Sequence, residues 1–264
     1  MIRIWSLFII AAGILVLLSC DTPPEAYRPE PNVHCIIYTD LPSPTVLAGM
    51  SVDMNDTTTN ALKWNGVQGV TGFLRSSRCT TSLRPCRDSA GFYRAEDFSF
   101  SPGDECFLEL RYPDGRIVSG GTQVPDSCPA RVSGVDTVFV SYYPGDSWPT
   151  IRISIEHPHS ASSPGFVIRA NHFYQSSSDT MSTGEMSWRS GAESDTLYAA
   201  PFYFGRAPDD TLWLRTVTIR VVAVDRNVCD YYPTQPFAAR KMHLEGALGL
   251  FGSGVVTSLR VTFP

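Results

Sequence analysis

The chain has 264 residues and a formal net charge of −5, and its 21 lysine and arginine residues form no run. This charge pattern excludes the basic footprint that is typical of nucleic-acid-binding proteins. The length exceeds the roughly 100–200 residues of one typical domain, so we expect two domains.

The first 20 residues have the features of a bacterial lipoprotein signal. Arg3 precedes an apolar run from Ile4 to Leu18, and Leu17-Leu18-Ser19-Cys20 follows the pattern of a lipobox. The run is shorter than the roughly 20 apolar residues that a membrane-spanning helix needs. We expect residues 1–19 to be removed and Cys20 to carry lipid that anchors the protein to a membrane. A plain secretory signal is the alternative.

A tether is predicted between the lipid and the folded body, over residues 20–32. Four prolines stand between positions 21 and 31. Proline disfavours both a helix and the centre of a sheet, so this segment predicts an extended spacer.

From Val33 onward, short apolar and β-branched runs alternate with turn residues, a pattern that predicts β-strands. In the clearest hairpin, residues 107–112 lead into Pro113-Asp114-Gly115 and the chain returns along residues 116–124. Pro fixes φ and Gly supplies a positive φ at such a turn. We expect residues 33–126 to form an N-terminal β-sandwich domain.

Residues 127–264 are predicted to form a C-terminal antiparallel β domain. No window of a dozen residues has a helical period with caps, and short strands with turns between them predict an all-β protein of two sandwich-like domains. The expected strands of this domain are 135–143, 151–156, 166–174, 212–224 and 255–263.

The cysteine count agrees with a lipid on Cys20. Of the seven cysteines, six remain when Cys20 is set aside, and an even number in an exported protein predicts disulfides. Cys79 and Cys86 bracket a short polar segment and are the one pair that their position suggests. A zinc site is the alternative, although there is no CxxC motif. The six disulfide candidates are Cys35, Cys79, Cys86, Cys106, Cys128 and Cys229.

Few residues offer catalytic chemistry. His157 and His159 would share one face of an extended segment, but two ligands do not make a metal site. A hydrolase would need these histidines or His172 close to an acid such as Asp209. Asp209-Asp210 also fits a turn before the next strand. We predict no enzyme, no cofactor and no metal.

Aromatic clusters leave a ligand platform and ordinary packing both open, and Gly252-Ser253-Gly254 is interpreted as a turn. The aromatic clusters are Tyr142-Tyr143, Phe202-Tyr203-Phe204 and Tyr231-Tyr232. Five Asp-Ser/Thr steps resemble an O-glycosylation sequon of exported Bacteroidota proteins, and they fit equally well a turn that leads into a strand. These steps begin at Asp88, Asp136, Asp179, Asp195 and Asp210.

The segment from Leu244 to Gly254 resembles a signature of a Bacteroidota lipoprotein family, catalogued as domain of unknown function 4249. The residues that carry the resemblance are Gly246, Gly249, Phe251 and Gly252. The lipobox, the 101–110 segment and the run that starts at Ile151 also agree with the family pattern. The resemblance implies an immunoglobulin- or transthyretin-like first domain and an outer-membrane location. It also implies a gene beside a TonB-dependent receptor, and it carries over no catalytic residue.

The anchor, the tether, the all-β body and the resemblance together lead to one functional expectation. We expect a non-enzymatic lipoprotein of the outer membrane, attached to the bilayer through Cys20. It would serve as a binding or accessory subunit of a TonB-dependent receptor in uptake or surface assembly. A structural or adhesive surface lipoprotein is the second hypothesis, and a hydrolase is the third.

Overall fold

A computed structural model describes residues 27–52, 65–87, 89–141, 147–157, 164–176, 179–190, 194–204, 211–231 and 243–264. Strands dominate this part of the chain and confirm the predicted all-β class. The signal peptide, Cys20 and the first part of the tether lie outside the described residues. No helix within the described ranges is long and apolar enough to cross a membrane.

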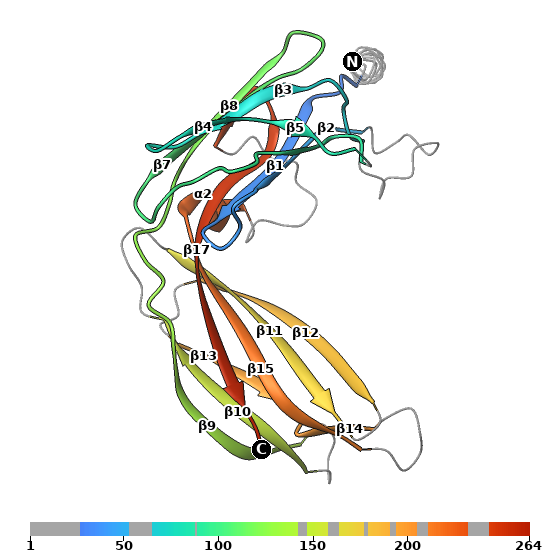
Figure 1. The fold of residues 1–264 in the computed structure, drawn as a ribbon, viewed down its shortest axis with the longest axis vertical. Coiled ribbons are helices and arrows are strands. Elements are labelled where there is room, and N and C mark those ends of the chain that lie inside the picture. The colour runs from blue at the N-terminus through green and yellow to red at the C-terminus, as the bar shows by residue number, and fades with distance from the viewer. Residues whose placement is uncertain are drawn as a thin grey trace, which may run out of the picture.

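The upper body in Figure 1 is built from two facing groups of strands. One group follows the order β17-β1-β2-β6-β5, and the other the order β16-β8-β7-β3-β4. The strands of the first group are β1 (Pro31–Tyr38), β2 (Thr45–Met50), β5 (Arg84–Pro85), β6 (Phe92–Arg94) and the first half of β17 (Leu248–Thr262). Those of the second are β3 (Thr71–Arg75), β4 (Thr80–Ser82), β7 (Glu105–Arg111), β8 (Ile117–Gln123) and β16 (Leu244–Glu245).

The predicted hairpin is confirmed by the pairing of β7 with β8. The two strands pair antiparallel from Glu105↔Gln123 to Arg111↔Ile117, and Gly115 in the turn has a φ of 87°. Alternate residues of β7 face the core, since Leu108 and Leu110 are buried. The residues between them therefore point to the outer face of the sheet.

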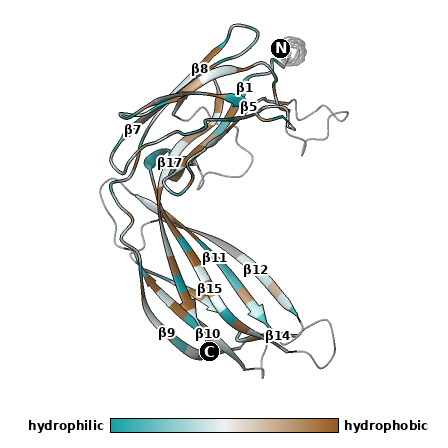
Figure 2. Ribbon diagram, in the orientation of Figure 1, coloured by the Kyte–Doolittle hydropathy of each residue, from teal (hydrophilic) through white to brown (hydrophobic). Residues whose placement is uncertain are grey.

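The lower body packs a small sheet against a larger one (Figure 1). The small sheet has the order β13-β10-β9, and the larger has the order β12-β11-β15-β17, with β14 also pairing with β15. Figure 2 shows hydrophobic and hydrophilic residues alternating along these strands, as expected where one face is buried. The strands are β9 (Arg131–Val140), β10 (Trp148–Glu156), β11 (Gly165–Gln175), β12 (Thr180–Ser190), β13 (Ser194–Ala199), β14 (Phe202–Phe204) and β15 (Thr211–Val224).

One strand, β17, belongs to both bodies. Its residues 248–254 pair parallel with β1, and its residues 254–262 pair antiparallel with β15. The predicted domain limits assign residues 127–264 to one unit, whereas this pairing joins residues 248–254 to the first body. Such a pairing links strands far apart in the sequence, so it cannot be predicted from a local sequence pattern.

A salt bridge adds a second connection between the bodies. The Arg220 guanidinium of β15 donates to both carboxylate oxygens of Asp40, at 2.9 and 2.7 Å. The same guanidinium lies over the ring of Tyr38, 4.7 Å from its centroid. This contact and β17 both connect the two bodies.

Candidate functional site

The family-like C-terminal motif lies near the place where β17 passes from one body to the other. We call this region, made of the middle of β17, the helix after β15 and the end of β8, the joint. Gly246 and Gly249 have positive φ angles of 79° and 109°. A Cβ added at Gly249 would lie 1.9 Å from the carbonyl oxygen of Val33, so only glycine allows β17 to approach β1 here. Phe251 is fully buried, and Gly252 lies directly against Val228 of the helix α2 (Arg226–Tyr231). These four residues therefore have structural roles in the described structure.

A buried polar cluster fixes the same joint. Asp225 is 2% exposed, and one of its carboxylate oxygens accepts a hydrogen bond from the Val228 amide at 3.0 Å, which caps α2. The Thr122 hydroxyl of β8 donates to the other oxygen. Asn227 donates its side-chain amide to the carbonyls of Gly121 and Phe251, both at 2.8 Å. Burial raises the pKa of Asp225, and hydrogen bonds from its neighbours oppose the rise only in part.

Gly252-Ser253-Gly254 lies within β17, so its interpretation as a turn is wrong. Ser253 is fully buried, 2.8 Å from the Thr122 hydroxyl, and its own hydroxyl donates to the Gln123 carbonyl at 3.3 Å. Small residues occur here because β17 passes close to α2 and β15, not because the chain reverses.

The predicted disulfides are not supported, because the six described cysteines are free. Cys79 precedes β4, which pairs with β3, whereas Cys86 follows β5, which pairs with β6 in the other sheet. The segment between them crosses from one sheet to the other instead of closing as a loop. Cys35 and Cys106 are buried on facing sheets, where desolvation raises the pKa of each to about 12. Cys128 is also buried, and Cys229 is partly buried.

Two of the histidines considered for a hydrolase, His157 and His172, lie in the lower body. His157 is fully buried at the end of β10, with its ring 4.4 Å from that of Phe166, and His172 is 6% exposed on β11. His159, Asp209 and Asp210 lie outside the described residues. Within the described ranges, no three His, Cys, Asp or Glu residues form a group that could hold a metal ion.

The described residues of two aromatic clusters pack against different strands, β15 and β1. Phe202 packs against Trp213 with ring centroids 5.8 Å apart. The ring centroids of Tyr231 and His34 are 6.2 Å apart. Tyr142, Tyr143 and Tyr232 lie outside the described residues.

Two of the five Asp-Ser/Thr steps have the hydrogen bonding expected where a strand begins. The carboxylates of Asp179 and Asp195 accept a hydrogen bond from the amide of the following threonine, at 2.8 and 2.7 Å. Asp136 instead forms a salt bridge with Arg152. Asp88 and Asp210 lie outside the described residues, and glycosylation of these steps stays a prediction.

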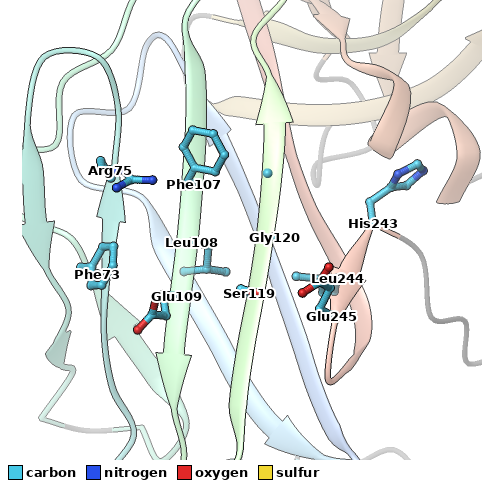
Figure 3. A pocket seen from close by; sticks show the side chains of 11 residues that line it. Phe73, Arg75, Phe107, Leu108, Glu109, Ser119, Gly120, His243, Leu244 and Glu245 are labelled. Atoms are coloured by element: carbon cyan, nitrogen blue, oxygen red, sulfur yellow. The ribbon is translucent and has the colours of Figure 1, made fainter.

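A hollow of about 510 Å³ on the outer face of the β16-β8-β7-β3 sheet is the candidate binding site. Figure 3 shows its walls, with β3 and β7 on one side and the segment that leads into β16 on the other. Its size falls within the range of small-molecule sites. We call it the β8 hollow, because Ser119, Gly120 and Gly121 of β8 form its floor.

Strand register explains why a hollow forms here. One row across the sheet contains Phe73, Glu109, Ser119 and Glu245, which are paired in that order. In the next row Phe107 is paired with Gly121. Small residues on β8 thus lie between larger side chains on both neighbouring strands, and the surface sinks along β8.

The basic side chains at the β8 hollow contact groups other than its carboxylates. The Arg75 guanidinium lies over the ring of Phe107, 4.9 Å from its centroid. The Nε2 atom of His243 is 3.0 Å from a carboxylate oxygen of Asp230. Glu109 and Glu245 form no ion pair with any residue that the structure describes. Two carboxylates are therefore available to a ligand.

Sequence reasoning did not find these residues, although one signal was present. Phe107 lies on the strand whose Leu108 and Leu110 form the buried face, so it points outward and is 39% exposed. Single outward-facing aromatic rings are common on protein surfaces, so this signal does not mark a binding site by itself. Glu245 lies beside Ser119 although it is more than a hundred residues later in the sequence, and this pairing could not be predicted from local patterns.

Comparisons with known proteins give no family. No family model and no curated protein matches the chain. Among solved structures, the chain is similar to the FN1–FN3 domains of chicken CNTN1, with 12% identity, a TM-score of 0.30 and coverage of 90% of this chain and 69% of that one. A DUF4785 family protein from Legionella pneumophila is 14% identical, with a TM-score of 0.24, 78% of this chain covered and 52% of that chain. These likenesses are too distant to indicate a function, and the resemblance to family 4249 stays a prediction.

Proposed function

We propose that this protein is a lipid-anchored, non-enzymatic binding subunit of the outer membrane that serves a TonB-dependent receptor in uptake or surface assembly. The β8 hollow is the observation that carries the proposal. It offers aromatic surface and two available carboxylates on paired strands, which is the chemistry of recognition by a pre-formed site.

The position of the hollow also supports this function. The tether leads into β1, so the lipid at Cys20 would hold the body that carries the hollow. The second body continues from the first through β17 and contacts it through the salt bridge between Arg220 and Asp40. A binding body joined to a second body would suit an accessory subunit that presents its ligand to a receptor.

Co-purification from solubilised outer membranes tests the proposal. The lipidated chain with an affinity tag should recover a TonB-dependent receptor in a ratio near one to one. A Cys20→Ala variant, which cannot be acylated, is the control for nonspecific recovery from the detergent extract. Recovery of the lipidated chain with no stoichiometric membrane partner would contradict the receptor role and favour the adhesive alternative.

A further inference from the structure

The charge within the β8 hollow identifies the kind of ligand that it would accept. Glu109 and Glu245 occupy the same cross-strand row, one on each side of Ser119. Neighbouring strands are roughly 4.8 Å apart, so these two residues arise roughly 10 Å from each other and face the same hollow. A single positively charged group placed above Ser119 can meet both carboxylates.

The basic side chains of the lining form no ion pair with this row. Arg75 is stacked on Phe107 in the adjacent row, where it keeps its charge, and His243 is directed to Asp230. An anionic ligand would meet one guanidinium and two carboxylates, whereas a cationic ligand would pair with two carboxylates that have no ion-pair partner among the described residues.

Apolar surface lies beside the carboxylates. Phe73 is paired with Glu109 in the same row, and the Phe107 ring forms the neighbouring part of the wall. Aromatic rings favour the aliphatic stem of a long cationic side chain, and the Phe107 ring already has the Arg75 guanidinium over it. The lining thus offers a place for a cation and a place for the hydrocarbon that carries it.

We propose that the β8 hollow binds a primary alkylammonium group, with its nitrogen between Glu109 and Glu245 and its carbon chain along Phe73 and Phe107. A compact ammonium has three donors, which can meet both carboxylates and the Ser119 hydroxyl together, whereas a planar guanidinium favours one carboxylate. This inference rests on the proposed function, in which the hollow is a binding site. The group can come from a free amine or from a lysine side chain of a polypeptide.

Calorimetric titration of the full lipidated chain in detergent tests the ligand class. The probes are pentylamine, its neutral counterpart pentanol, its anionic counterpart pentanoate, and a short extended peptide with lysine or norleucine at its centre. We expect pentylamine to bind at least tenfold more tightly than pentanol or pentanoate. A further preference for the lysine peptide over pentylamine would identify a polypeptide as the source, and the reverse order a free amine.

Matched variants locate the interaction. Glu109→Gln and Glu245→Gln should each weaken amine binding about tenfold, because each removes one charge-assisted hydrogen bond. Glu105→Gln changes an exposed acid of the same strand outside the lining and should leave binding unchanged. Equal binding of pentylamine and pentanol, or unchanged amine binding in both lining variants, would overturn the amine inference. If no probe binds while a receptor still co-purifies, the amine inference fails and the receptor role stands; if neither is seen, both fail.

Discussion

Replacing Asp225 by alanine tests the joint between the two bodies. The carboxylate is 2% exposed, accepts a hydrogen bond from the Val228 amide and is the acceptor for the Thr122 hydroxyl of β8. Alanine removes both acceptors: the Val228 amide loses its acceptor in a region that is closed to water, whereas the Thr122 hydroxyl can turn to the Ser253 hydroxyl, 2.8 Å away. The change acts on α2, on β8 and, through Ser253, on the strand that the two bodies share.

The expected magnitude follows from these contacts. Loss of the helix cap leaves the buried Val228 amide without an acceptor, which costs about 1–3 kcal/mol. Relief of the buried charge offsets part of this cost, because desolvation already raises the pKa of Asp225. We expect the free energy of unfolding to fall by about 2 kcal/mol, which lowers the Tm by roughly 4–8 °C.

Thermal unfolding followed by circular dichroism measures this effect. Asp136→Ala is the control, because Asp136 pairs with Arg152 at the surface, where a salt bridge contributes about 0–1 kcal/mol. A Tm of the Asp225→Ala variant that is no lower than that of Asp136→Ala would refute a stabilising role for the cluster. Loss of structure in only one body would refute its role as a joint between two.

Three further predictions concern pH, backbone approach and thiols. The pKa of Asp225 in the folded protein is raised above 3.8, so its ionised form lowers the stability at neutral pH, and this loss disappears as the pH falls through the folded pKa. In urea titrations at decreasing pH, wild type should therefore gain stability relative to Asp225→Asn. A constant difference between the two proteins would contradict this. Gly249→Ala should lower the free energy of unfolding by at least about 2 kcal/mol, because its Cβ would meet the Val33 carbonyl, and an unchanged urea midpoint would contradict the close approach. Native maleimide labelling followed by peptide mapping should modify Cys79 before Cys35, because burial raises the pKa of Cys35 to about 12. At Cys79, desolvation is outweighed by the hydrogen bonds of Ser99, Ser76 and Thr81 together, which lower the pKa. Equal labelling rates would contradict this difference.

Local patterns were sufficient to predict much of the fold. The alternation along residues 107–112 and the following Pro113-Asp114-Gly115 specify a hairpin and its buried face, since side-chain period and turn chemistry are properties of neighbouring residues. The alternation in residues 255–263 likewise places Val255 toward the core of the lower body, whereas Ser258 and Arg260 are exposed.

Features that join distant segments were not predictable in this way. Gly252-Ser253-Gly254 has the composition of a turn, and only its packing against α2 and β8 explains why it continues a strand. The disulfide expectation rested on counting cysteines, which carries no information on which sheet each cysteine joins. The β8 hollow depends on Glu245 meeting Ser119, a pairing of two short segments that no periodicity encodes.

Native mass spectrometry of protein taken from its own outer membrane in mild detergent tests most directly whether the protein binds through the β8 hollow. The samples are wild type, Gly121→Tyr, which fills the floor beside Phe107, and Thr71→Tyr, which adds the same ring at an exposed position of the same sheet outside the lining. We predict a stoichiometric bound partner on wild type and Thr71→Tyr that is lost from Gly121→Tyr. The same bound mass on all three proteins, or none on wild type, would contradict binding through this hollow.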